Sequence, residues 1–210
     1  MILYLIRHGE SAFNAEGRIQ GQMNPPLSEL GRRQSLALVP AMLELGIEAV
    51  YASPLERAFD TARPSAAALG QEIRPLESLM ELNAGIFQGK TWPRIRDEHP
   101  AESQRWLSGE ADFRIPGGES RRDLMVRGRA VLSLIRQGNE RAVAVFSHGG
   151  ILSAALKSLL EIPAELNPFS FFNGSLSKLS WQSQIKLLTL NQIDHLRRPD
   201  GGYDTKSGDL

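Results

Sequence analysis

Three short apolar runs of strand length constrain the fold of this chain more than any other feature. They cover residues 1–7, 47–52 and 142–146, and each precedes a helical pattern. Buried strands that alternate with helices are typical of layered α/β domains, in which helices cover both faces of a mostly parallel sheet. The sequence therefore predicts a three-layer α/β sandwich.

The remaining segments complete the predicted architecture. Helices are expected over residues 28–45, 54–69, 119–137 and 149–160, with a kink or break at Pro40 in the first of them. Residues 73–79 form a short, weak strand, and residues 175–181 and 185–190 form an antiparallel C-terminal hairpin. We expect one catalytic domain over 1–194, a helical lid insertion over about 84–118, and a polar tail over 195–210 that takes no part in the core.

Composition excludes several classes of function. The 210 residues include 24 Lys or Arg and 24 Asp or Glu, so the chain lacks the basic excess of a nonspecific nucleic-acid binder. With no cysteine, it can have neither a thiol nucleophile nor a zinc–thiolate site. Because its apolar runs are too short for a signal peptide or a membrane span, we expect a cytoplasmic protein without membrane partners. The oligomeric state stays open, a homodimer included.

Polar motifs follow the three apolar runs directly. Arg7 ends the first run and His8 follows it, Arg57 lies just after the second, and His148 and Gly149 follow the third. Ligands of open α/β sheets bind beyond the carboxyl ends of the strands, so these side chains should converge at one sheet edge. Gly149 can also open a helix, whose N-terminus favours an anion.

These motifs resemble those of the histidine phosphatase superfamily, the phosphoglycerate mutase-like proteins. The Arg-His-Gly-Glu sequence at residues 7–10 is followed at the family's distances by Asn14 and by the Gln20-Gly21 pair. Matching elements follow in the family's order over residues 26–31, 53–62, 81–89, 116–120 and 147–150. The resemblance spans roughly residues 1–190. Gln88 stands where the phosphatase branch usually has Glu, and residues 83–84 also depart from the pattern, which leaves the lid and the substrate preference open.

The resemblance implies a phosphoryl-transfer mechanism that needs neither a metal nor another cofactor. His8 would attack phosphorus and form a phosphohistidine that water then hydrolyses. Arg7, Arg57 and His148 would hold the phosphoryl oxygens, and Glu81 would protonate the departing alkoxide. The substrates implied are small phosphorylated metabolites. The expected substrate-binding residues also include Asn14, Gln20, Gly21 and Gly149.

Three alternatives to a metal-independent phosphomonoesterase remain. A mutase would return the phosphoryl group to another position of the same skeleton, and a binding module would use the fold without catalysis. Residues 84–91 also fit a relaxed P-loop pattern, but a weak strand precedes them and Pro93 follows soon after, so we interpret that match as chance. The side chains expected to line the substrate lid are Phe13, Met23, Ile86, Phe87 and residues near Phe113.

Overall fold

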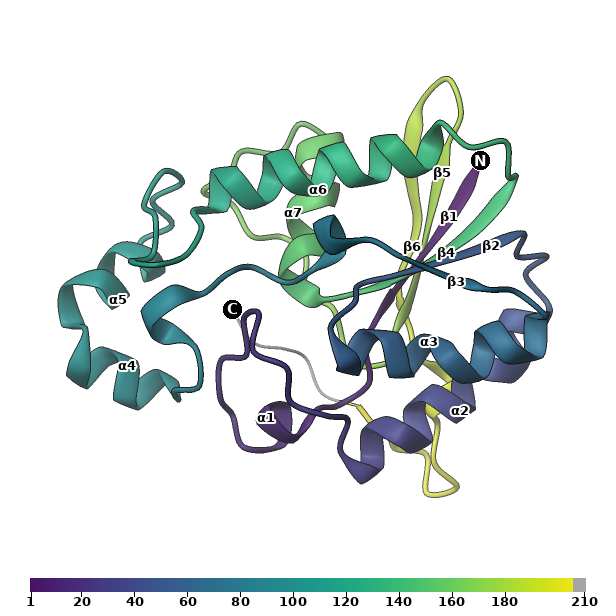
Figure 1. Cartoon of the computed structure of the whole chain (residues 1–210), viewed down its shortest axis with the longest axis horizontal. Coiled ribbons are helices and arrows are strands. Elements are labelled where there is room, and N and C mark those ends of the chain that lie inside the picture. The colour runs from purple at the N-terminus through teal and green to yellow at the C-terminus, as the bar shows by residue number, and fades with distance from the viewer. Residues whose placement is uncertain (206–210) are drawn as a thin grey trace.

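The computed structural model of the chain describes residues 1–205 and is built around a six-stranded sheet (Figure 1). The strands are β1 (Ile2–Arg7), β2 (Ala49–Ala52), β3 (Ile73–Pro75), β4 (Ala142–Ser147), β5 (Leu176–Trp181) and β6 (Ile185–Gln192). The α-helices are α1 (Ala12–Ala15), α2 (Glu29–Leu43), α3 (Glu56–Leu69), α4 (Trp92–Glu98), α5 (Pro100–Leu107), α6 (Arg121–Arg136) and α7 (Gly149–Leu159). Short 3₁₀ turns are η1 (Glu77–Leu79), η2 (Gly85–Phe87) and η3 (Asp194–Leu196).

The sheet has the strand order β3-β2-β4-β1-β5-β6. The four strands from β3 to β1 are parallel to one another, whereas β5 runs antiparallel to both β1 and β6. The N-terminal strand β1 therefore lies in the interior of the sheet, between β4 and the C-terminal hairpin. This arrangement confirms the predicted mostly parallel sheet with an antiparallel hairpin.

Two helical layers cover the sheet (Figure 1). Side chains of β1 alternate between them, because successive residues of a strand face opposite sides. Leu3 and Leu5 pack in the cluster formed with α6 and α7, while Tyr4 and Ile6 pack in the cluster formed with α2 and α3. The three-layer sandwich predicted from the sequence is confirmed, and each face of the sheet is sealed by its own apolar core.

Helix α2 corrects one prediction. It continues through Pro40 to Leu43, so the predicted break does not occur. Proline removes one backbone hydrogen bond, here the one to the carbonyl of Leu36. Because both residues are exposed and only three residues follow Pro40 in the helix, water can take the place of the missing donor.

The predicted lid segment and the described part of the tail both pack against the rest of the domain through buried apolar side chains. Helices α4 and α5 extend from the sandwich and share an apolar cluster with the start of α6 and with α7 (Figure 1). The prediction that the tail from residue 195 takes no part in the core is wrong for Leu196, which is buried against α2. The Gln34 amide also donates to the Asp204 carbonyl oxygen, and residues 206–210 of the predicted tail lie outside the described residues. Within residues 1–205, no helix combines the length and apolarity needed to cross a membrane.

Candidate active site

Neighbouring strand ends place two histidines side by side. In the parallel ladder Arg7 pairs with Ser147, and the backbone N–H of His8 donates to the Ser147 carbonyl oxygen at 3.0 Å. The imidazole centroids of His8 and His148 are 5.1 Å apart, and the ring planes make an angle of 59°. Since each histidine lies one residue beyond the last pair of its strand, the register of β1 and β4 sets their proximity.

The ring orientation of His8 suits a nucleophile. Its Nδ1 lies 2.6 Å from the carbonyl oxygen of Gly9. A carbonyl can only accept, so Nδ1 carries the proton and Nε2 keeps its lone pair. Burial, together with the charges of Arg57 and Arg7, holds the pKa of His8 well below its usual 6.5. His8 is therefore neutral at pH 7.

Two glycines fix the backbone around His8. The N–H of Gly9 donates to Thr61 Oγ1 at 2.9 Å. A Cβ on Gly9 would lie 2.6 Å from the carbonyl oxygen of Gly31, and a Cβ on Gly31 would lie 2.0 Å from that of Glu10. These backbone segments approach so closely that only glycine fits at both positions.

His148 is fully buried just before α7. Its Nε2 lies 2.8 Å from Ser53 Oγ, at the end of β2. Burial, followed by the charge of Arg57, lowers the pKa of His148 well below 6.5. Its Nδ1 is buried and has no hydrogen-bond partner among residues 1–205, a condition that a bound ligand can relieve.

Arg7 and Arg57 are buried almost completely beside the histidines. Arg7 Nη1 donates to the Phe171 carbonyl oxygen at 2.6 Å. Arg57 donates from both terminal nitrogens, at 2.8 Å each, to the carbonyl oxygens of Met23 and Gly21. The guanidinium groups are thus held rigidly where burial strengthens their field, an arrangement that favours an anion with several oxygens.

Glu81 binds the N-terminus of α7. Its carboxylate accepts from the backbone N–H groups of Leu82 at 2.8 Å, Gly150 at 2.9 Å and Ile151 at 3.0 Å. The last two belong to the first turn of α7, where N–H groups lack partners within the helix. All three donors suit the ionised carboxylate, which they hold at the same end of α7 as His148.

Arg127 positions Glu81, and sequence reasoning did not single it out. Its guanidinium donates to the carbonyl oxygens of Met80 at 2.5 Å and Glu81 at 3.1 Å, and pairs with the Glu119 carboxylate at 2.8 Å. A detectable signal existed, because Arg127 lies three residues after Leu124 and so borders the apolar face of α6.

Two predicted substrate-binding residues shape the loop after β1. Asn14 forms a capping box with Ser11 at the start of α1, and its Oδ1 accepts from Ser11 N at 3.1 Å. Ser11 Oγ donates to the Oε1 of Gln20, which is buried, at 2.7 Å. The Asn173 amide donates to the His8 carbonyl oxygen at 3.2 Å and to Asn14 Oδ1 at 3.3 Å. Asn173 carried no signal in the sequence, because its role depends on the return of the chain beside β1.

The two predicted glycines contact the arginines. Gly21 has a φ of +53° and supplies one of the carbonyl oxygens that hold Arg57. Gly149 begins α7, and a Cβ at this position would lie 3.5 Å from Arg7 Nε. Ser53 and Thr61 belong to the motif noticed over residues 53–62, but their hydrogen bonds to the histidine loops appear only in three dimensions.

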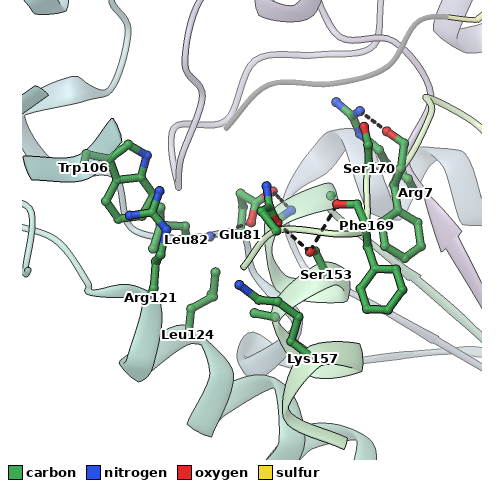
Figure 2. A pocket seen from close by; sticks show the side chains of 15 residues that line it. Arg7, Glu81, Leu82, Trp106, Arg121, Leu124, Ser153, Lys157, Phe169 and Ser170 are labelled. Carbon is green, nitrogen blue, oxygen red and sulfur yellow. Dashed lines mark hydrogen bonds between the residues drawn. The ribbon is translucent and has the colours of Figure 1, made fainter. Parts of the chain in front are cut away.

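The residues that line the pocket beside the site differ from the side chains expected in the substrate lid. Of the side chains expected in the substrate lid, Phe87 and Phe113 are buried in the apolar cluster that α4 and α5 share, and they do not line this pocket. Phe13, Met23 and Ile86 do not line this pocket either. Its volume is about 100 Å³, and Arg7, Glu81 and Gly149 line it together with side chains from α5, α6, α7 and the segment before β5, as Figure 2 shows.

Comparison with known protein families identifies the family of this chain. The model of the histidine phosphatase superfamily, branch 1, matches residues 3–193. One curated relative, a protein of Escherichia coli O1:K1 / APEC named "Probable phosphoglycerate mutase GpmB", is 33% identical over 207 residues, which cover 94% of this chain and 95% of the relative.

Solved structures give the same result. The mycobacterial glucosyl-3-phosphoglycerate phosphatase, solved with VO3, is 32% identical with a TM-score of 0.82, and the match covers 90% of this chain and 98% of that one. The phosphoserine phosphatase of Entamoeba histolytica, solved with 3-phosphoglyceric acid, is 26% identical with a TM-score of 0.83, and the match covers 93% and 98%. Both chains are similar to this one over almost their whole length.

Proposed function

The chain belongs to the histidine phosphatase superfamily, branch 1, and from this premise we propose that it is a phosphomonoesterase that forms a phosphohistidine on His8. The observation that carries the proposal is the pair of buried imidazoles of His8 and His148, with centroids 5.1 Å apart and pKa values lowered well below 6.5. A neutral imidazole can attack phosphorus, and the buried guanidinium groups of Arg7 and Arg57 offset the charge of the phosphoryl oxygens.

In the first step, the Nε2 lone pair of His8 forms a bond to phosphorus while the ester P–O bond breaks. The departing oxygen takes a proton from Glu81, which returns to its carboxylate form. Because three backbone N–H groups suit the ionised carboxylate, we propose that this proton arrives with the substrate, bound as a phosphate monoanion.

In the second step, water attacks the phosphorus of the phosphohistidine. The Glu81 carboxylate accepts a proton from this water, the N–P bond breaks, and its electron pair returns to Nε2 of His8. Arg7, Arg57 and His148 hold the phosphoryl oxygens through both steps, so the charge that develops meets donors already in position. Phosphate then leaves with the proton from Glu81, and the resting enzyme is restored.

A mutase is the second candidate, and the name of the Escherichia coli relative favours it. In a mutase the phosphohistidine would return its phosphoryl group to another hydroxyl of the same molecule instead of to water. The names of the phosphatases among the solved structures favour hydrolysis of small phosphorylated metabolites, which is the activity that we propose.

Product analysis separates these activities. The purified protein is incubated with a panel of phosphorylated metabolites without added metal, and phosphate and organic products are measured together. We expect equal amounts of phosphate and alcohol. An isomeric phosphoester without phosphate release would identify a mutase, and binding without any product would indicate a non-catalytic phospholigand module.

A further inference from the structure

The pocket beside the catalytic residues extends to α5, the start of α6, α7 and the segment before β5. Its volume is about 100 Å³, and it shares Arg7, Glu81 and Gly149 with the candidate active site. At its other side lie Arg121, at the start of α6, and Lys157, on α7 (Figure 2). A molecule bound at His8 could therefore extend into a space that carries two additional positive charges.

Arg121 is partly buried, and within residues 1–205 no carboxylate pairs with it. Its guanidinium carbon lies over the Trp106 ring, 3.7 Å from the ring centroid, a cation–π contact that helps to hold the group in place. Its Nη1 is buried and has no hydrogen-bond partner in the described part of the chain. Burial lowers the pKa of the guanidinium, which means that its charge is poorly solvated.

Lys157 is buried on the neighbouring helix, and its charge is not neutralised. Its Nζ donates to the carbonyl oxygens of Ala164 at 3.1 Å and Leu166 at 2.9 Å, both of them uncharged acceptors. Burial, followed by the charge of Arg121, lowers the pKa of the ammonium, and only the exposed Glu165 raises it.

Two buried cations near each other are costly unless an anion accompanies them. Among the described residues that line the pocket, Glu81 alone carries a carboxylate, and its two oxygens accept from three backbone N–H groups. The walls between the two ends include the apolar side chains of Leu82, Leu124 and Ala154. Such a channel suits a short carbon skeleton with an anionic group at each end.

We propose that Arg121 and Lys157, with Trp106 as a platform, form a subsite for a second anionic group of the substrate. This inference rests on the proposed function and narrows its substrate class to phosphomonoesters that carry a carboxylate or a second phosphate a few bonds from the phosphoryl group. The shared chemistry is a set of oxygens with delocalised negative charge, which the planar guanidinium and the ammonium bind together.

Three substrates of equal carbon length test the subsite. Propyl phosphate has no second anion, 3-phosphooxypropanoate has a carboxylate, and propane-1,3-diol bisphosphate has a second phosphate. Since a hydrogen bond to a charged group contributes roughly 1.5–3 kcal/mol, at least one anionic substrate should exceed propyl phosphate in kcat/KM by about 10- to 100-fold. The anionic substrate with the larger increase in kcat/KM shows whether the subsite prefers a carboxylate or a phosphate.

Three variants assign the effect. Arg121→Gln and Lys157→Gln should each remove most of this preference while kcat/KM for propyl phosphate stays near that of the wild type. Arg122→Gln is the matched control, because Arg122 follows Arg121 on α6 but is exposed and pairs with Asp112. Circular dichroism checks folding, and the two subsite variants serve as independent tests in case one of them unfolds.

A binding measurement separates this inference from the proposed function. In a His8→Ala background, which cannot form the phosphohistidine, calorimetry compares the affinities of the same three compounds with and without Arg121→Gln. If no substrate is hydrolysed but the anionic compounds bind more tightly and lose this advantage in the variant, the subsite is supported and the proposed function fails. If propyl phosphate binds and reacts as well as both anionic compounds, or if Arg121→Gln and Lys157→Gln keep the preference, the subsite is overturned.

Discussion

The backbone N–H of His8 donates to the carbonyl oxygen of Ser147, the residue immediately before His148, at 3.0 Å. This bond continues the β1–β4 ladder by one step beyond the last strand pair. It places both histidines one residue beyond the carboxyl ends of their strands, which is why their separation depends on strand register.

Replacing the proposed nucleophile should abolish turnover. We expect His8→Ala to lower kcat by about 10⁴-fold or more, because the substitution removes the imidazole lone pair that is proposed to attack phosphorus. The reaction should be quenched in alkali, because phosphohistidine hydrolyses in acid. Mass spectrometry should then find phosphate on wild-type His8. His99→Ala, in the lid, is the control and should remain active. Phosphate on Ser11 or Ser147 would contradict the mechanism.

Vanadate should inhibit the enzyme, and chelators should not. Vanadate adopts the five-coordinate geometry of the phosphoryl group in the transition state of transfer. Arg7, Arg57 and His148 can bind its oxygens. Arg57→Gln should weaken this inhibition by about 10- to 100-fold, as expected for the loss of a charged hydrogen-bond donor. Loss of activity with EDTA, followed by recovery with magnesium or zinc, would show that the guanidinium groups are not sufficient.

Glu81→Gln should affect alkyl and aryl phosphates differently. An alkoxide is strongly basic and needs a proton as it leaves, whereas p-nitrophenolate does not, so the variant should slow alkyl phosphates by about 10²–10⁴-fold and spare the aryl substrate. Single-turnover phosphorylation of His8 should be followed, since slow hydrolysis of the phosphohistidine would hide the contrast. Equal losses for both substrates would make Glu81 a positioning residue, and Glu10, whose carboxylate accepts from Ser28 Oγ at 2.8 Å, would be tested next.

Stability should decrease as the pH falls below 6.5. Burial lowers the pKa of His8 and His148 well below this value in the folded protein and also lowers that of His195. At pH values between the unfolded and folded pKa, the unfolded chain binds more protons, so acid favours unfolding. Each such histidine contributes at most about 1.4 kcal/mol per pH unit. Urea unfolding at pH 7.5 and 5.5 should show the loss, and His148→Gln should reduce it; a pH-independent free energy of unfolding would refute the assignment of neutral buried imidazoles.

The contact between Gly31 and the His8 loop should be essential for both stability and activity. A methyl group at Gly31 would lie 2.0 Å from the Glu10 carbonyl oxygen, and such overpacking costs roughly 1–3 kcal/mol or more. Gly17→Ala is the control, since Gly17 has a φ of +66° but open space around it, so the variant should lose only roughly 1–2 kcal/mol and stay active. Thermal unfolding and phosphate release would measure both effects. Equal behaviour of the two variants would mean that the loop can shift without consequence.

Much of the fold could be predicted from the periodicity of apolar residues and from the glycines that end helices. The helix expected over residues 119–137 forms as α6 and buries Leu124, Gly128, Val131, Leu132 and Ile135, which recur at helical spacing. Gly70 ends α3 in the left-handed conformation, as a helix-terminating glycine should. The convergence of His8 and His148 also followed from the sequence, because the carboxyl ends of parallel strands share one edge of a sheet.

What could not be predicted depends on tertiary packing. Nothing in the local sequence shows that Trp106 carries the Arg121 guanidinium, because α5 and α6 are separated by an irregular segment whose path is set by the core beneath it. Leu196 likewise lies in a polar stretch and is buried only because η3 packs on α2. The exposed surroundings of Pro40, which make its helical position tolerable, are also a property of the folded chain.

The interior position of β1 has a consequence for synthesis. The ribosome makes this strand first, yet both of its partners come late, since β4 spans Ala142–Ser147 and β5 spans Leu176–Trp181. Until those segments emerge, the apolar strand has two open edges, and such edges invite pairing with other chains. A nascent chain therefore carries His8, the proposed nucleophile, from the beginning but cannot assemble the candidate site until nearly all of the protein has been translated.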